Sequence, residues 1–448
     1  MRNQFRALAL CAAAITIAIP AAALAQDPQG DVAWDILAGL TSEVGPRMPG
    51  TEAEARARVW AEARLKALGF SNVVTEPFTF RGYLRGRDEA SLVAPIPFRL
   101  AITALGYSGT TPEKGLEGEV VYFPTLDALR AAPAGSLTGK IAFIDHAMRR
   151  TQDGSGYGPY GAVRRQGPAI AAGKGAVAAV IRSIGTDSHR NPHTGSTSFP
   201  DGVKPIPAGA VSNPDADLIA RIARSGKPMR LSLVLTGRTT DNLPSGNVLA
   251  ELPGRDPSLP PLLLGCHLDS WDLGTGAIDD AAGCAIITAA ALNVHKAQQP
   301  LRTIRLLWAG AEELGGWGGR AYAQRHTEPH ALAMESDFGA GRVWRVSFAM
   351  ADMNKPLADR IAAALGPLGI VRGEGKATGG TDVRPMIERQ KLAVVDLDQD
   401  GTHYFDLHHT PDDTLDKVDP ADLAQNVAAW TQTLSILANE AGPISATP

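Results

Sequence analysis

Histidine and acidic residues in the C-terminal half of the chain stand close to apolar runs that are typical of buried strands. Imidazole nitrogens and carboxylate oxygens are the usual ligands of catalytic zinc ions. Two cations that share a carboxylate activate water for attack on an amide or ester bond. The ordered set therefore predicts a two-zinc hydrolytic site. The candidates are His267, Asp269, Asp279, Glu312, Glu313, Asp337 and His409.

The first of these, His267, directly follows the apolar run PLLLGC, so its ring is expected at the edge of a sheet. A metal-bound histidine usually donates its second ring N–H to a carboxylate, which fixes the tautomer. Asp269, two residues further on, is placed to accept that hydrogen bond. The alternative is a surface histidine beside an acidic residue.

Two pairs of adjacent acidic residues each offer a choice of ligand. Asp279 and Asp280 stand where a loop leads into a helix, and either can cap that helix. We assign Asp279 as the carboxylate that bridges both metal ions and Asp280 as the cap. Glu312 and Glu313 follow the strand-like run TIRLLWAG, where two ionised, unpaired carboxylates would be costly. We expect Glu313 to bind metal and Glu312 to act as the general base.

The last candidates come from two places: Asp337 follows the run ALAMES, and His408 and His409 precede the C-terminal helix. Asp337 can serve as a terminal ligand, although an ordinary loop aspartate fits the same position. We expect His409 to be a ligand and His408 to be a structural histidine, while Asp413 and Thr414 shape the loop. The sequence contains no Cys2His2, HExxH, P-loop or GxSxG pattern, which removes several competing classes of site.

The elements that position these residues alternate between strand and helix from residue 247 onward, which predicts an open α/β sheet with its ligands at the carboxyl edge. Residues 51–69 predict an amphipathic helix that Thr51 caps and Gly69 ends. From residue 107 to 244 the chain is glycine-rich, with short β runs such as EVVYF and KIAFID. We interpret residues 107–244 as a domain inserted into a catalytic domain made of residues 26–106 and 245–448.

The N-terminus predicts export. Arg2 and Arg6 precede an apolar stretch and the A-x-A-like site at residues 23–25, as in a cleavable secretory signal peptide. The run from Ala7 to Ile19 is short for a membrane span, and no other segment is long and apolar enough. We therefore expect a signal peptide over residues 1–25, no membrane span, and a periplasmic or extracellular protein.

Charge and cysteine content exclude further classes. The net charge of −4 becomes about −6 once a signal peptide with two arginines and no acids is removed, which argues against nucleic acid as a partner. Only Cys266 and Cys284 remain in the mature chain, so the protein is not a disulfide scaffold. We expect two buried thiols in preference to a disulfide.

The strings HLDSWDLGTGAIDD, AEELGG, ESD and HHTPDDT resemble the signature of the co-catalytic zinc exopeptidases. The resemblance spans about residues 30–440 and includes a protease-associated (PA) domain in the inserted region. It implies an α/β fold, a three-layer αβα sandwich with a mixed, largely parallel central sheet and a β-rich PA domain. It also implies two zinc ions per chain. One is held by His267 and Asp337 and the other by Glu313 and His409, with Asp279 as the bridge.

The same resemblance implies roles for three further residues and for the substrate. Glu312 would be the catalytic acid/base, and Asp269 the partner of His267. Related aminopeptidases carry a tyrosine that stabilises the oxyanion just before the last histidine ligand; His408 has that place here and is a candidate for the role. The family recognises a free α-amino group and cleaves dipeptides or N-terminal residues. Residues 270–276 and 379–382 are candidate recognition loops.

Two other functional classes fit the same scaffold. One is a single-zinc amide hydrolase or cyclase, and the other is a non-catalytic receptor-like protein, against which the complete set of ligands argues. The inserted domain can also be a binding or dimerisation module, which would make the protein a homodimer.

Overall fold

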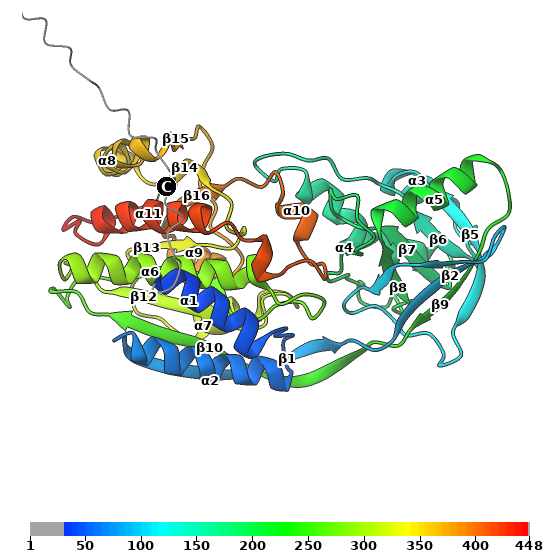
Figure 1. Cartoon of the computed structure of the whole chain (residues 1–448), viewed down its shortest axis with the longest axis horizontal. Helices are drawn as coiled ribbons and strands as arrows, with labels where there is room; N and C mark the ends of the chain where they lie inside the picture. Colours follow the sequence, from blue (N-terminus) through cyan, green and yellow to red (C-terminus); the bar gives the residue numbers. More distant parts are fainter. Residues whose placement is uncertain (1–30, 447–448) are drawn as a thin grey trace, which may run out of the picture.

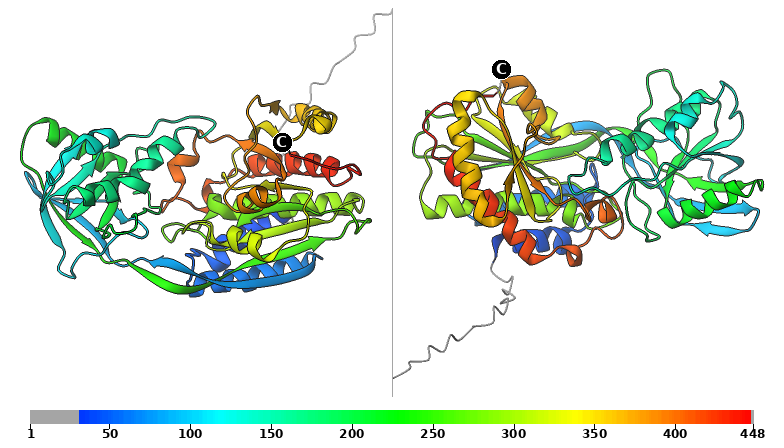
Figure 2. Two further views of the ribbon diagram at one scale, coloured as in Figure 1. Left: turned by 180° about the vertical axis from the view of Figure 1, so that it is seen from behind. Right: turned by 90° about the horizontal axis from the view of Figure 1, so that it is seen from above.

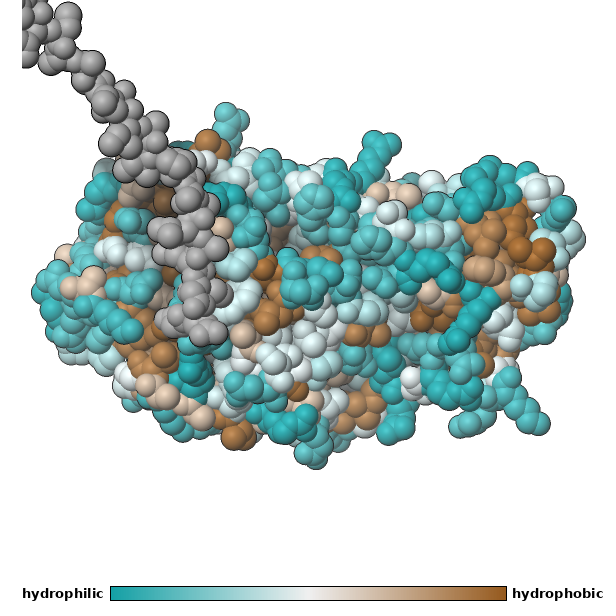
Figure 3. Space-filling view, in the orientation of Figure 1, coloured by the Kyte–Doolittle hydropathy of each residue, from teal (hydrophilic) through white to brown (hydrophobic). Residues whose placement is uncertain are grey.

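The structure, a computed structural model, describes residues 31–446. The predicted signal peptide lies outside the described residues. Two eight-stranded sheets form two lobes that lie side by side along the long axis of the molecule (Figure 1). On the face seen in Figure 3, both lobes are mainly hydrophilic, with hydrophobic residues in scattered groups.

The first sheet is mixed, and its order is β1-β10-β12-β11-β13-β16-β14-β15. The central strands β12, β11, β13 and β16 are parallel, whereas β1, β10 and β14 pair antiparallel. The prediction of a mixed sheet is therefore confirmed, with the parallel strands in the centre of the sheet. The bounds are β1 Ser71–Leu84, β10 Arg238–Leu252, β11 Leu262–His267, β12 Ile304–Ala309, β13 Leu332–Glu335, β14 Val343–Ala349, β15 Val371–Arg372 and β16 Ala393–Gln399.

Helices cover both faces of this sheet, because successive strand residues point to opposite sides. Leu262 and Leu264 of β11 belong to the core beneath α1, α2, α6 and α11, while Leu263 packs in a smaller core beneath α7 and α9. Figure 2 shows the sheet between these two layers, which confirms the αβα sandwich. The bounds are α1 Val32–Gly39, α2 Glu52–Ala67, α6 Ala282–Ala297, α7 Trp317–Arg325, α8 Lys355–Leu365, α9 Arg384–Gln390, α10 Tyr404–Leu407 and α11 Pro420–Leu437.

The helix predicted over residues 51–69 is α2, and its ends are those that the sequence indicates. Thr51 Oγ1 accepts a hydrogen bond from the Glu54 N–H at 3.4 Å, and Gly69 adopts a positive φ of 90° just beyond the helix. A side-chain cap of this kind is common at the start of a helix, and a glycine with positive φ is common at its end.

The second sheet has the order β3-β2-β9-β5-β6-β7-β8-β4 and is consistent with the PA domain expected from the sequence. Its strands β5, β6, β7 and β8 are parallel, and the other pairs are antiparallel. The bounds are β2 Asp88–Ala94, β3 Phe98–Leu100, β4 Ile102–Ala104, β5 Leu116–Phe123, β6 Ile141–Ile144, β7 Ala178–Arg182, β8 Ala208–Val211 and β9 Arg230–Leu235, with α3 Leu126–Ala131, α4 Tyr157–Gly173 and α5 Asn213–Arg224.

The chain passes between the lobes along β1 and β10, which pair antiparallel from Ser71↔Glu251 to Leu84↔Arg238. The expected start of the inserted domain, residue 107, lies between β4 and β5, which belong to the same sheet. Strand β2 also belongs to that sheet, since it pairs with β9. An insertion that contains the whole sheet therefore begins before β2. We propose residues 85–237 as the inserted unit, and we call it the inserted lobe.

A disulfide joins Cys266, at the end of β11, to Cys284 in the first turn of α6. The expectation of two free thiols is therefore wrong. The Cα atoms lie 5.2 Å apart although 18 residues separate them in sequence, because the intervening loop returns α6 to the end of β11. Asp280 supports the same junction, since it accepts hydrogen bonds from the N–H groups of His267 and Gly283. This confirms Asp280 as a cap of α6.

Among residues 31–446, one segment, Ala277–Ala297, is long and apolar enough to cross a membrane, and 94% of its most apolar window is buried inside the protein. It contains α6, the core helix of the first lobe.

Arg47 is fully buried and ties the N-terminal segment to the loop after β11. Its guanidinium donates to the carbonyls of Leu268 at 2.7 Å, Thr275 at 2.6 Å and Gly276 at 2.9 Å. Its backbone N–H donates to Ser270 Oγ at 3.1 Å. One buried side chain therefore holds the loop that leads to Asp279 at three of its carbonyls.

Arg47→Met should lower the free energy of unfolding by at least about 3 kcal/mol, because several buried carbonyls lose a charged donor together. Urea unfolding of the metal-free protein, followed by circular dichroism, measures this loss. Arg56→Met is the matched control, since Arg56 is exposed on α2. Equal losses in both variants would contradict the role of Arg47.

Candidate metal centre

The predicted metal residues meet at the carboxyl ends of three neighbouring parallel strands. His267 ends β11, Glu312 and Glu313 follow β12, and Asp337 follows β13. His409 comes from the loop after α10. Of these residues, Glu312, Glu313, Asp337 and His409 line a cavity of about 580 Å³ that is also lined by residues of the inserted lobe.

The first cluster contains His267, Asp279 and Asp337, whose ligand atoms lie within 4.8 Å of one another. His267 Nε2 is 3.0 Å from Asp279 Oδ1 and 3.4 Å from Asp337 Oδ1. On the other side of the ring, His267 Nδ1 is 3.0 Å from the Asp269 carbonyl oxygen. A carbonyl only accepts, so Nδ1 carries a proton and a neutral ring presents its Nε2 lone pair to the two carboxylates.

The second cluster lies around His409 on the other side of Asp279. His409 Nε2 is 3.3 Å from Asp279 Oδ2 and 3.0 Å from Glu313 Oε2. Asp279 thus directs one oxygen toward each histidine, which is the arrangement of a bridging carboxylate. His408 and His409 also form a group with Asp279 whose ligand atoms lie within 4.8 Å of one another.

These distances fit zinc. Ligands about 2.0–2.1 Å from a tetrahedral zinc ion lie roughly 3.3 Å from one another, and the contacts above range from 3.0 to 3.4 Å. Within residues 31–446, the buried atoms Asp279 Oδ2 and Glu313 Oε1 also lack a hydrogen bond. Lone pairs of carboxylates and neutral imidazoles repel at such distances unless a proton or a cation lies between them.

Asp269 has a different contact from the one expected. Its carboxylate Oδ1 lies 3.9 Å from His267 Nδ1, and its backbone carbonyl takes the hydrogen bond instead. The carboxylate accepts the backbone N–H groups of Glu312 at 3.1 Å and Glu313 at 3.2 Å. The buried Asp269 side chain therefore fixes the backbone of the two glutamates.

Glu312 lines the cavity beside these clusters. Burial raises the pKa of Glu312 well above its usual range, and the nearby carboxylates of Asp337 and Glu313 raise it further. Such a group binds a proton readily in the absence of a cation.

His408 lies parallel to His409, with ring centroids 3.5 Å apart. Its Nε2 is 3.7 Å from Asp279 Oδ2, and the rings of Tyr157 and Tyr404 pack around it. Burial lowers the pKa of His408 well below its usual range, and the neighbouring His409 lowers it further. This environment favours a neutral ring at the cavity wall.

Sequence reasoning missed one carboxylic acid of the cavity wall, Glu335, whose neighbour Asp382 is the last residue of an expected recognition loop. Glu335 Oε2 accepts the N–H groups of Asp382 and Val383, both at 2.9 Å. Burial raises the pKa of Glu335 to about 8, and Asp337 adds to this shift. In the sequence, Glu335 stands two residues before the expected ligand Asp337, in MESD, and Asp382 is the last residue of GGTD. Of the two recognition loops expected, residues 379–381 line the cavity, whereas residues 270–276 do not.

The model of Peptidase family M28 matches residues 247–434. Carboxypeptidase Q of Bos taurus is 32% identical over 412 residues, which cover 91% of this chain and 85% of that protein. Carboxypeptidase Q of Homo sapiens is also 32% identical, over 413 residues, with the same coverage. These relatives extend the match to the inserted lobe.

Solved structures show the same architecture. A peptidase M28 precursor from Shewanella amazonensis SB2B shares 46% identity and a TM-score of 0.90, with 94% of this chain and 96% of that chain covered. A zinc aminopeptidase from Bacillus subtilis shares the fold at 17% identity, with a TM-score of 0.65 and coverage of 91% and 95%. The chain therefore belongs to peptidase family M28, as a metallo-exopeptidase similar to carboxypeptidase Q.

Proposed function

We propose that this chain is a dinuclear zinc exopeptidase that hydrolyses dipeptides or removes N-terminal residues from peptides with a free α-amino group. The observation that carries the proposal is the position of Asp279, with one oxygen 3.0 Å from His267 Nε2 and the other 3.3 Å from His409 Nε2. Asp337 would complete one site and Glu313 the other. The similar proteins support the reaction class, since they include carboxypeptidase Q and a zinc aminopeptidase.

In this proposal each residue around the cavity has a defined task. Zinc, when bound, acidifies water and polarises the scissile carbonyl. Glu312 takes the proton of the attacking water and delivers it to the leaving amine. The Asp269 carboxylate holds Glu312 in place by accepting a hydrogen bond from the Glu312 backbone N–H. His408 is the candidate donor to the developing oxyanion, because its ring lies at the cavity wall beside Asp279.

We also propose that the protein is exported to the periplasm or the extracellular space. The disulfide between Cys266 and Cys284 supports this, since disulfides persist in oxidising compartments. The N-terminal signal pattern in the sequence agrees with it.

Zinc content and substrate range test the proposal together. We expect two zinc ions per mature chain and cleavage of free dipeptides or of an amino-acid anilide, with no cleavage of N-blocked dipeptides. Metal analysis and chromatography of the products measure both. One zinc ion with cyclised product would favour the single-zinc cyclase, and no zinc with no cleavage would favour the receptor-like protein.

Glu312→Gln should reduce kcat by at least about 10²-fold while both metal ions stay bound, because positioned acid/base catalysis contributes roughly 10²–10⁴-fold. Steady-state kinetics on metal-replete protein measure the loss. Glu388→Gln is the matched control, since Glu388 is exposed on α9. Full activity of a metal-replete Glu312→Gln protein would exclude Glu312 as the acid/base.

A further inference from the structure

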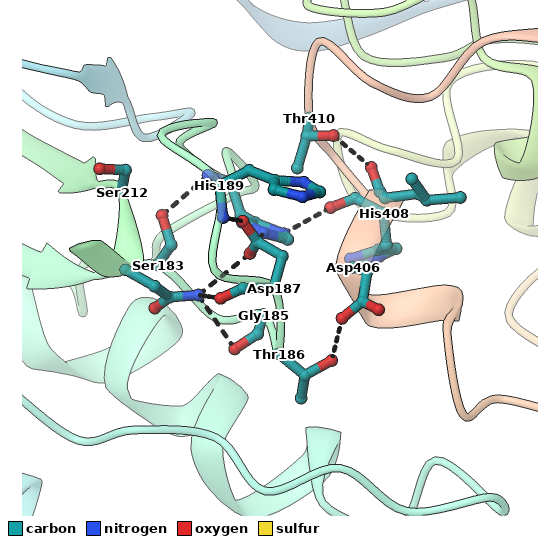
Figure 4. A network of polar contacts seen from close by, with 12 residues as sticks. Ser183, Gly185, Thr186, Asp187, His189, Ser212, Asp406, His408 and Thr410 are labelled. Carbon is teal, nitrogen blue, oxygen red and sulfur yellow. Dashed lines mark hydrogen bonds and ion pairs between the residues drawn. The ribbon is translucent and has the colours of Figure 1, made fainter. Parts of the chain in front are cut away.

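The inserted lobe contacts the loop that carries His409. Residues 183–196, which follow β7 and which we call the docking loop, lie against residues 402–410, the histidine loop (Figure 4). Thr186 donates from its hydroxyl to Asp406 Oδ1 at 2.8 Å and from its backbone to the Phe405 carbonyl at 3.0 Å. The two loops are therefore joined by specific hydrogen bonds, although more than 200 residues separate them in sequence.

His193 makes the most deeply buried of these contacts. Its Nδ1 lies 2.8 Å from the His408 carbonyl oxygen, and its Nε2 lies 2.7 Å from Asp187 Oδ1. The side chains of His193 and Asp187 are 0% and 1% exposed. The backbone N–H of His193 donates to Ser183 Oγ at 2.8 Å, which fixes the docking loop to the end of β7.

The partners of Asp187 determine which atoms of His193 carry protons. Asp187 accepts the His189 N–H at 2.9 Å and the Asn213 side-chain amide at 3.1 Å, so its carboxylate acts as an acceptor. The His408 carbonyl can only accept as well. Both nitrogens of His193 therefore donate, and the ring links Asp187 in the inserted lobe to the histidine loop in the other lobe.

The next residue, Thr194, contacts His409 itself. The Thr194 N–H donates to the His409 carbonyl at 3.0 Å, and His409 Nδ1 lies 3.2 Å from the Thr194 carbonyl oxygen. Arg164 Nη1 donates to the same oxygen at 3.1 Å. Arg164 Nη1 also lies 3.4 Å from His409 Nδ1, but the Thr194 carbonyl at 3.2 Å is the nearer partner, so Nδ1 carries its proton toward that carbonyl and Nε2 is left free toward Asp279 and Glu313.

We propose that the inserted lobe is part of the metal centre. The Thr194 carbonyl sets the tautomer of His409, and His193, held by Asp187, is a positioning residue that fixes the histidine loop through the His408 carbonyl. Such outer contacts of a metal-bound histidine orient the ring and raise its basicity. The inference rests on the proposed function in one respect, that His409 binds zinc.

The competing explanation is that the contact between the lobes is purely structural. Two substitutions of His193 distinguish this explanation from the positioning role. The amide nitrogen of Asn stands near the position of the histidine Nδ1, whereas that of Gln stands near Nε2. His193→Asn therefore keeps a donor toward the His408 carbonyl and loses the bond to Asp187. His193→Gln keeps a donor toward Asp187 and loses the bond between the lobes. Each variant loses one buried hydrogen bond of the His193 ring.

We expect His193→Gln to weaken binding of one of the two zinc ions by about tenfold, because loss of an outer-shell partner typically weakens metal binding 10–100-fold. His193→Asn should stay within about threefold of the wild-type affinity. Titration of the metal-free protein against a chromophoric chelator measures the affinities. The visible spectrum of the cobalt(II) protein reports the ligand geometry and should change only in His193→Gln. Thr186→Val, which removes the hydroxyl bond to Asp406, is the control and should leave both readouts unchanged.

Thermal unfolding of the metal-free variants shows whether either substitution acts through stability alone. Equal zinc affinities in His193→Gln and His193→Asn, with a wild-type protein that binds two zinc ions, would overturn the positioning role and leave the proposed function intact. The same loss of affinity in Thr186→Val would also overturn it, in favour of a general contact between the lobes. A wild-type protein that binds no zinc would overturn both proposals.

Discussion

Carboxyl groups buried at one edge of a sheet are the constraint on which the rest of the structure depends. Burial raises the pKa of Glu313 to about 7, and the neighbouring Asp279 adds to the shift. Leaving such groups ionised without compensation costs several kcal/mol each. His267 and His409 direct Nε2 at these carboxylates, while their Nδ1 protons are engaged by backbone carbonyls. Divalent cations between the rings and the carboxylates would satisfy these groups, which is the physical reason for the proposed zinc site.

The scaffold around this edge keeps the charged groups from separating. Parallel pairing of β11 with β12 and β13 brings the ends of three strands together, so His267, Glu313 and Asp337 arrive from different segments at one place. Asp280 and the disulfide hold the start of α6 against β11. Arg47 fixes the loop between them from the opposite side through backbone carbonyls. Asp280, the two cysteines and Arg47 do not line the cavity, yet each restricts the position of Asp279.

The sequence predicts the site well where the signal is local and poorly where the contact is long-range. An apolar run followed by His267 or by Glu312 and Glu313 already implies a strand end, because side-chain type and strand burial are read within a few residues. The limits of the inserted lobe depend on β2 pairing with β9, more than 130 residues away, and no local pattern encodes that pairing. The Cys266–Cys284 disulfide likewise depends on how a loop returns. For Asp269 the backbone carbonyl contacts His267 in place of the expected carboxylate, since proximity in sequence does not distinguish the two groups.

The contact between Thr194 and His409 has a thermodynamic consequence for the whole molecule. If the His409 ring binds metal best when its Nδ1 proton is held by the inserted lobe, then bound metal must in turn favour the arrangement of lobes in which that bond exists, because coupling between two equilibria is reciprocal. The chain itself passes between the lobes along β1 and β10, which pair as antiparallel strands. A metal ion at His409 would therefore stabilise this arrangement of the lobes, in which the cavity walls come from both. Metal binding and the shape of the substrate cavity would then depend on one another, with the Thr194 carbonyl as one of the contacts that couple them.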